Sequence, residues 1–215
     1  MPSHADQRGP FRAAATTAAL AWLAILAAGC GGEGEGPEAG LTVELAPVEG
    51  EVLVREPGEQ TFVSLEDAEQ MPVGTHVDAS RGTVLLTSAD DDGGTQSGEF
   101  SRGEFTVEQA AGESLVTLLM RGGDFGPCKT RAARLDESTV GGPEIRRLFA
   151  DAEGDFRTRG RFAAATVRGT RWKTVDACFG TLTDVAAGAV TVTDFIQDRT
   201  VEVGAGDELW IARDP

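Results

Sequence analysis

The stretch "TVRGTRWKTVDACFG", residues 166–180, carries the pattern that decides the fold. Val167 and Trp172 are both typical core residues, but they are five positions apart, and the two-residue period of a strand would place them on opposite faces. One extra residue at Gly169–Thr170 would return both side chains to one face, and glycine accepts such a bulge at little cost. The stretch therefore predicts a strand that is redirected at this point, and it requires no catalytic chemistry.

Similar short runs follow one another along the chain. They are rich in valine and threonine, as in "LTVELAPV", "EVLVRE", "RGTVLLTS" and "SLVTLLMRG". Clusters of Gly, Pro or Asp separate them at intervals of about ten residues, which is typical of all-β domains. No stretch shows a clean helical period, and the chain contains 28 glycines. We therefore predict an all-β fold with Gly-rich turns and little helix, either a sandwich or a short solenoid-like module.

The same punctuation divides the chain into segments. A lipoprotein-type signal peptide (1–29) and a flexible tether (30–40) precede an N-terminal β lobe (41–127). An irregular connection (128–143), with a possible short helix in "TRAARLDE", leads to a C-terminal β lobe (144–215). In that lobe "EIRRLFADAEGDFRTRGRF" predicts a hairpin with "DAEG" as its turn. A helix beginning at Pro143 is the alternative.

Two weak similarities between segments of the chain raise the question of an internal duplication. "GEFSRGEFTV" (98–107) resembles "GDFRTRGRFAAATV" (154–167), and "RGTVLL" (81–86) resembles "RGTRW" (168–172). Short strand-forming segments of low complexity also resemble each other by chance. Duplication and chance similarity therefore both stay open at this point.

The N-terminal residues predict export. Arg8 and Arg12 precede an uncharged apolar segment, which is the layout of a secretory signal and is short for a membrane span. The segment ends in "LAAGC", which resembles the lipobox of bacterial lipoproteins and predicts lipidation of Cys30. The usual leucine three places before the cysteine is replaced by Ala27, so plain cleavage or an uncleaved anchor are alternatives. We expect a membrane lipoprotein that faces away from the cytoplasm.

The charge distribution excludes one class of partner and suggests another. The formal net charge is −16, and such an acidic protein is not expected to bind nucleic acid. Residues 121–173 nevertheless contain twelve Lys or Arg against seven Asp or Glu. This excess is either a solvated face or a docking surface for an acidic partner or a polyanionic glycan, with Arg157, Arg159 and Arg161 as its candidates.

Apart from Cys30, the chain has two cysteines, Cys128 and Cys178. In an oxidising compartment they predict a disulfide, which the chain-entropy model values at about 4 kcal/mol for a loop of this length. Two separate buried thiols are the alternative. A catalytic or metal role would need helper residues, and His76 is the one histidine of the exported part. We expect no metal and no cofactor.

Three stretches of the C-terminal lobe resemble the FecR-type sensory domain of bacterial envelope proteins. In that family a Val-Arg-Gly-Thr strand precedes an aromatic residue, a strand pair interrupted by glycine follows, and a Gly-x-x-Leu strand closes the domain. The residues in those places here are Val167, Arg168, Gly169, Thr170, Trp172, Gly188 and Gly206. The resemblance implies an extracytoplasmic binding or signalling module and not an enzyme. It also implies a protein partner in the envelope or membrane.

Known members relay signals to a sigma factor through a cytoplasmic domain. Here the apolar segment begins only twelve residues into the sequence, so direct sigma-factor regulation is not expected. A free-standing cell-wall or glycan-binding protein is the alternative function. In that case Trp172 and Trp210 would be candidate sugar platforms, although both fit core positions better.

Two further chemistries fit the sequence poorly. "ADDDGG" (89–94) places three carboxylates before glycine, but the ligands of calcium loops alternate along the chain, so an exposed hairpin turn is the better interpretation. A hydrolase would have to use His76 as its neutral-pH imidazole base, and no nucleophile motif accompanies it.

Overall fold

The computed structural model describes residues 36–129 and 141–213. The predicted signal peptide, Cys30, the first part of the tether and the possible helix in "TRAARLDE" lie outside the described residues. The described part consists of β-strands and one short 3-10 turn, so the predicted all-β class is confirmed.

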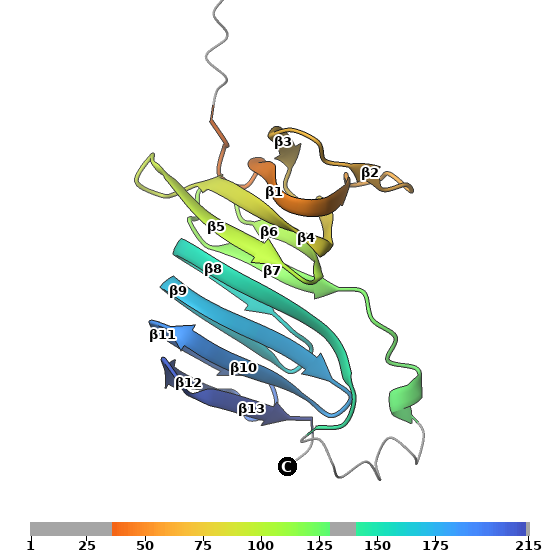
Figure 1. The fold of residues 1–215 in the computed structure, drawn as a ribbon. Helices are drawn as coiled ribbons and strands as arrows, with labels where there is room; N and C mark the ends of the chain where they lie inside the picture. The colour runs from red at the N-terminus through yellow and green to blue at the C-terminus, as the bar shows by residue number, and fades with distance from the viewer. Residues whose placement is uncertain (1–35, 130–140, 214–215) are drawn as a thin grey trace, which may run out of the picture. The chain divides into compact units, whose positions relative to one another are not determined.

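Within the described residues, thirteen strands belong to one hydrogen-bonded sheet (Figure 1). In chain order they are β1 (Thr42–Arg55), β2 (Val63–Ser64), β3 (Glu69–Pro72), β4 (His76–Ala89), β5 (Thr95–Ser101), β6 (Glu104–Gln109), β7 (Val116–Arg121), β8 (Glu144–Arg159), β9 (Ala163–Ala177), β10 (Gly180–Ala187), β11 (Ala189–Asp194), β12 (Arg199–Gly204) and β13 (Glu208–Ala212), with the 3-10 turn η1 (Pro127–Lys129) between β7 and β8. The sheet is continuous between the two predicted lobes, because β8 pairs with both β5 and β7.

Two antiparallel ribbons of long strands, β1–β4 and β8–β9, organise the sheet. Each long strand has one partner along its whole length on one edge and two partners in succession on the other. The free edge of β8, for example, pairs with β5 through Phe149–Glu153 and with β7 through Phe156–Arg159. Each long strand therefore contributes one half to each of two layers.

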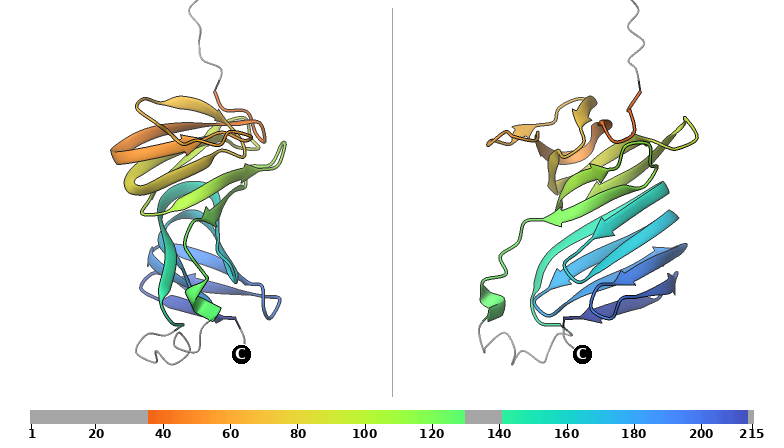
Figure 2. Two further views of the ribbon diagram at one scale, coloured as in Figure 1. Left: turned by 90° about the vertical axis from the view of Figure 1, so that its right-hand side faces the viewer. Right: turned by 180° about the vertical axis from the view of Figure 1, so that it is seen from behind.

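The two layers follow from these pairings (Figure 2). Layer A has the strand order β3-β1-β4-β5-β8-β9-β10-β13, and layer B has the order β2-β1-β4-β6-β7-β8-β9-β11-β12. The strands β1, β4, β8 and β9 appear in both layers because they bend from one into the other. The fold is therefore sandwich-like, which resolves the predicted choice between a sandwich and a solenoid.

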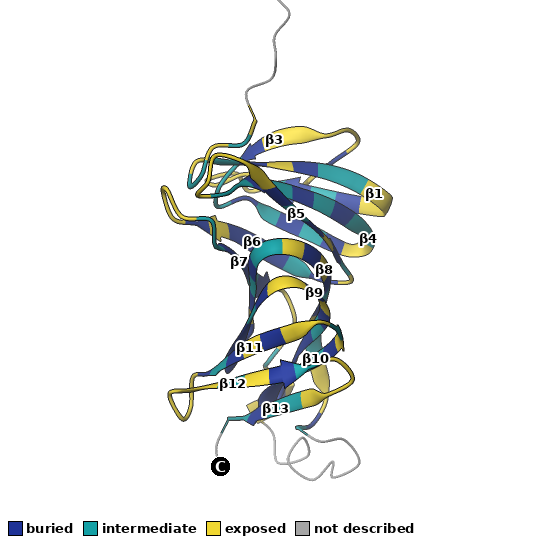
Figure 3. Cartoon of the chain, turned by 90° about the vertical axis from the view of Figure 1, so that its left-hand side faces the viewer, coloured by how far each residue is buried: buried dark blue, intermediate teal, exposed yellow. Residues whose placement is uncertain are grey.

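The core lies between the layers. Phe100 of β5 in layer A packs on Phe105 of β6 and Phe156 of β8 in layer B, with ring centroids 5.8 and 5.5 Å apart. All three rings are fully buried. The strands that carry them belong to a ring of pairings, β4–β5–β8–β7–β6, that closes on itself. Buried and exposed residues alternate along the outer strands, as a two-layer β fold requires (Figure 3).

The irregularity predicted in the opening stretch is confirmed. Val167 and Trp172 are both buried, and the two adjacent residues Arg168 and Gly169 between them are exposed, which breaks the alternation once. Gly169 has a φ of 80°, a conformation that costs glycine little. From this point β9 passes from layer B to layer A. The indole nitrogen of Trp172 then donates across the core to the hydroxyl of Thr158, at 2.9 Å.

The predicted position of the hairpin turn within residues 144–162 is wrong. "DAEG" does not reverse the chain as a hairpin loop, because Glu144–Arg159 is one strand with a register shift between Ala152 and Asp155. Gly154, with a φ of 111°, bends β8 between the layers. The reversal occurs later, at residues 160–162, and leads into β9. The sequence correctly located an irregularity at "DAEG". However, β8 stays one continuous strand there because it pairs with other strands on both of its edges.

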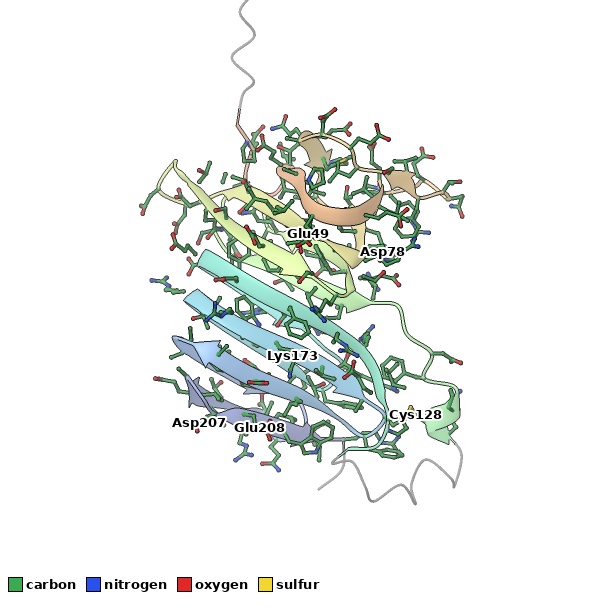
Figure 4. All side chains as sticks on the ribbon, viewed as in Figure 1. Glu49, Asp78, Cys128, Lys173, Asp207 and Glu208 are labelled. Atoms are coloured by element: carbon green, nitrogen blue, oxygen red, sulfur yellow. A yellow bond between two sulfur atoms is a disulfide. The ribbon has the colours of Figure 1, made fainter. Side chains whose placement is uncertain are left out.

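The predicted disulfide is confirmed. Cys128 of η1 and Cys178 after β9 are joined, with Cα atoms 5.1 Å apart (Figure 4). Beside it, the buried carboxylate of Asp176 binds the guanidinium of Arg146 at 2.8 Å and accepts the backbone N–H of Arg161 at 2.9 Å. Arg146 comes early in β8 and Arg161 follows its end, so this carboxylate ties the two layers together next to the disulfide.

Candidate functional site

The three arginines predicted as a docking surface lie at the layer B end of β8. Arg157 and Arg159 alternate with the buried residues Phe156 and Thr158, so both point away from the core. Arg161 follows in the turn to β9 and is exposed. The structure therefore brings all three to the outside of one layer.

Each of these guanidinium groups is held by neutral partners. The Nε of Arg157 donates to the hydroxyl of Thr166 at 3.0 Å. Arg159 lies over the ring of Phe195, 5.1 Å from its centroid, and Arg161 lies over Phe125 at 4.7 Å. Stacking on an aromatic ring fixes a guanidinium without neutralising its charge.

These arginines make no ion pair with any residue in the described part of the chain. Other arginines do: Arg168 binds Asp155 at 2.8 Å, and Arg146 binds Asp176. A fourth guanidinium, that of Arg121 on β7, also lacks a carboxylate contact there and donates to Thr106 at 2.9 Å. We refer to Arg121, Arg157, Arg159 and Arg161 together as the arginine face. It carries uncompensated positive charge on a strongly acidic protein.

Uncharged residues flank Arg157 and Arg159 on the neighbouring strands, whereas Arg121 lies opposite Glu104 on β6. The cross-strand neighbours of Arg157 are Thr117 on β7 and Thr166 on β9. Those of Arg159 are Leu119 on β7 and Ala164 on β9. Because residues paired across neighbouring strands point to the same side of a sheet, short side chains surround the long ones. The arrangement leaves the guanidinium groups as the projecting features of this face.

The hairpin between β11 and β12 adds an apolar edge. Phe195 and Ile196 are 39% and 40% exposed, and they are two of the five large apolar residues that are exposed in the described chain. The buried carboxylate of Asp194 accepts the backbone N–H groups of Ile196 and Gln197, at 2.9 and 3.1 Å. Burial alone would raise the pKa of Asp194, but these two bonds and the guanidinium of Arg199 outweigh it and lower the pKa. The tip is thus held in one conformation by a charged residue.

The residues that carry the FecR resemblance lie where strands change layer. Gly169 bends β9, and Gly188 separates β10 from β11, with the hydroxyl of Thr170 donating to the carbonyl of Ala189 at 3.0 Å. Gly206, with a φ of 86°, lies between β12 and β13. Val167 and Trp172 are core residues on either side of the first bend. The motif therefore acts structurally.

An open hollow of about 970 Å³ lies beside this motif. Arg168, Gly169 and Gly188 line it together with acidic residues from four other segments: Asp91, Glu113, Asp155 and Glu202. Ser114 at its wall donates to the Asp155 carboxylate at 2.8 Å. Sequence reasoning missed this hollow, because its lining comes from turns and bends that are far apart in the chain.

His76, the candidate base of a hydrolase, is engaged by charged neighbours. Its Nδ1 lies 2.9 Å from a guanidinium nitrogen of Arg55, and since arginine only donates, Nδ1 must accept. Its Nε2 is buried, 3.3 Å from a carboxylate oxygen of Glu104 but outside hydrogen-bonding geometry. Burial lowers the pKa of His76; Glu104 opposes this effect, and Arg55 and Arg121 add to it. An imidazole with its acceptor nitrogen already occupied is poorly placed to take a proton from a substrate.

The remaining candidates have structural contacts. The carboxylate of Asp90 accepts the backbone N–H groups of Asp92 and Gly94, at 3.0 and 2.6 Å, so "ADDDGG" forms the hairpin turn between β4 and β5, as expected. In the described part of the chain no group of His, Cys, Asp and Glu is arranged to hold a metal ion. Trp172 is a core residue, as expected, whereas Trp210 is half-buried.

Comparison with known proteins adds no further assignment. The chain matches no protein-family model, no curated protein and no solved structure. The FecR resemblance therefore stays a prediction from the motif. In residues 36–129 and 141–213, no helix is long and apolar enough to cross a membrane.

Sequence reasoning identified three members of the arginine face and missed what holds them. The excess of Lys and Arg in residues 121–173 was a sufficient signal for the positive charge. Phe125 and Phe195 are each 36 positions from the arginine they support, and no local pattern connects them. The pairing of β8, β9 and β11 brings Phe195 to Arg159, and Phe125 follows β7, which pairs with β8.

Proposed function

We propose that this protein is an exported, non-enzymatic binding or signalling module of the cell envelope, of the FecR type, anchored by a lipid at Cys30. The arginine face carries the proposal. Four guanidinium groups are fixed in place on neutral partners and free of ion pairs in the described chain, and three of the four arginines are exposed while Arg157 is half-buried. Orienting unpaired charges on a rigid sheet favours binding over catalysis, because it supplies complementarity without a nucleophile or base.

Two further observations support an extracytoplasmic setting. The Cys128–Cys178 disulfide indicates an oxidising compartment, because such bonds are rare in reducing cytoplasm. The first strand, β1, begins at Thr42, shortly after a Gly- and Glu-rich segment that follows Cys30. A short segment of this composition would hold the domain close to an anchored N-terminus.

The first test of this function is chemical crosslinking on intact cells that produce the protein, followed by purification and identification of its covalent partners. Repeated recovery of one envelope or membrane protein at high yield is the expected result. Recovery of wall polymer alone would move the glycan-binding alternative to first place. Recovery of neither would argue against a binding module.

The anchor has a separate test. An intact mass of the native protein should correspond to a chain that begins at Cys30 and carries added acyl groups. A chain that begins there without acyl mass would contradict lipidation and leave secretion after plain cleavage. The same spectrum reports the disulfide through its two missing hydrogens.

The glycan-binding alternative is favoured by one observation, the pairing of Arg157 with Thr117 and Thr166 across the strands of layer B. Its test is retention on immobilised cell-wall polysaccharide, comparing the wild type with an R157Q/R159Q/R161Q variant. Equal retention of the two proteins would count against this alternative.

A further inference from the structure

We infer that the arginine face and the tip of the β11–β12 hairpin form one docking surface for an acidic protein partner that also presents an apolar site. The inference rests on the proposed function and specifies the partner class. It comes from three features of the described residues: the unpaired guanidinium groups, the exposed apolar tip and the absence of lysine among the charged residues of the surface.

The tip and the arginines are physically continuous. Arg159 stacks on Phe195, and the backbone N–H of Phe195 donates to the carbonyl of Phe162 at 3.0 Å, next to Arg161. Ile196 follows at the apex, and its N–H is fixed by Asp194. A partner that contacts Ile196 and Phe195 would therefore lie beside Arg159 and Arg161 as well.

The composition of this surface favours a protein over a polyanionic polymer. Protein interfaces are enriched in Arg and aromatic residues and depleted in Lys, with apolar anchors at the centre and charges around them. The four charged residues of the arginine face are all arginines, and two of them stack on phenylalanine rings. The hairpin tip adds the exposed side chains of Asp198 and Arg199. A polymer of phosphates or sulfates would gain little from the exposed side chains of Phe195 and Ile196, whereas a protein pocket would bury them.

The charge of the partner follows from complementarity. Because this protein carries a net charge of −16, a positive face stands out in a field that otherwise repels acidic molecules. Guanidinium groups held in fixed orientations suit bidentate carboxylate partners. The partner surface is thus expected to place Asp or Glu side chains around an apolar depression.

The test is site-specific photocrosslinking on intact cells. A photoreactive p-benzoylphenylalanine replaces Ile196, which leaves Phe195 and its stack with Arg159 in place. The same residue at Val63, 57% exposed on β2, is the matched control position. We expect one protein product at position 196 that is absent at position 63, with acidic residues around the crosslinked site in the partner.

The charged half of the surface is tested in the same cells. Addition of R157Q/R159Q should lower the yield of the crosslinked product at least tenfold. The control R81Q/R171Q removes two exposed arginines of equal charge that lie outside the arginine face and form ion pairs, and it should leave the yield unchanged. Accumulation of the disulfide-bonded protein is checked for every variant, and R157Q alone replaces the double variant if that fails to accumulate.

Several outcomes would overturn the inference. These are no product at position 196 beyond that at position 63, a product that is insensitive to R157Q/R159Q, or a lipid or polysaccharide adduct in place of a protein. If general crosslinking recovers a protein partner but position 196 does not touch it, this inference fails and the proposed function stands. If neither method recovers a partner, both fail.

Discussion

The two long ribbons, β1–β4 and β8–β9, make the same bend with different local means. In each, the second strand carries Arg-Gly-Thr at the bend: residues 81–83 in β4 and 168–170 in β9. In each, that arginine binds a carboxylate that directly follows a glycine in the first strand. Arg81 binds Glu51 at 2.6 Å, and Arg168 binds Asp155 at 2.8 Å.

The two ribbons differ in the physical reason for a glycine at the bend. In the first ribbon Gly50 and Gly82 face each other, and a Cβ on Gly82 would lie 2.6 Å from the carbonyl oxygens of both Glu49 and Glu51. In the second ribbon a Cβ on Gly169 would meet nothing within 4 Å, and only its φ of 80° favours glycine. In the second strand of each ribbon, the glycine at the bend is thus required by close backbone packing at Gly82 and by dihedral freedom at Gly169.

The comparison bears on the question, left open by the sequence, of an internal duplication. The similarity between residues 81–86 and 168–172 is supported, because both segments occupy the same place in their ribbons. The similarity between residues 98–107 and 154–167 is wrong as a structural equivalence. The first segment crosses between layers from β5 to β6, whereas the second forms the β8–β9 hairpin within layer B.

The largest effect on the free energy of unfolding is expected from removing the disulfide, a constraint that only the second ribbon has. The disulfide connects η1 to the end of β9, and its loss in a C128S/C178S variant should lower the free energy of unfolding by about 4 kcal/mol. Urea denaturation of the folded domain measures this, with the reduced wild type as the matched control. A loss below about 1 kcal/mol would show that the Asp176 network alone secures this end of the sandwich.

Gly82→Ala should be the next largest, at about 3 kcal/mol, because the new Cβ has no space between two backbone oxygens. The matched control is Gly36→Ala, since a Cβ there meets nothing within 4 Å and its φ is unexceptional. Equal urea midpoints for the two variants would contradict the close packing of the first bend.

Gly169→Ala should cost less, about 1–2 kcal/mol, because it strains only the backbone dihedral. The comparison with Gly82→Ala in the same urea experiment is the direct test of the difference between the ribbons. If Gly169→Ala proves the more harmful of the two, the distinction between packing and dihedral freedom is wrong.

The smallest expected effect is a pH dependence near the first ribbon. Burial lowers the pKa of His76 below its usual value of 6.5, so the unfolded chain takes up a proton before the folded protein does. The free energy of unfolding should therefore fall as the pH drops below 6.5 towards the lowered value. A His76→Gln variant should lose less stability between pH 7.5 and pH 5.5 than the wild type, as measured by urea denaturation. Identical losses would remove His76 from this response.

Local sequence patterns predicted the features that depend on interactions between neighbouring residues. The alternation around Val167 and Trp172 placed both in the core, the glycine between them located a bend, and the acidic turn "ADDDGG" was recognised. The disulfide followed from the pairing of two cysteines in a chain that the sequence predicts to be exported. These features depend on side-chain period, dihedral freedom or cysteine chemistry, which neighbouring residues express directly.

The tertiary structure alone decided how these strands meet. No local pattern shows that β8 pairs with β5 over one half and with β7 over the other, so "DAEG" was misassigned as a hairpin turn. In the same way, Phe125 and Phe195 come to support Arg161 and Arg159 only through pairings between distant strands. Hydrogen bonding between strands is non-local, and a Val- and Thr-rich segment can pair with many other strands. The sequence therefore determined the class of the fold and the charge of the candidate face, while the layers, the bends and the surface that they assemble were selected by packing.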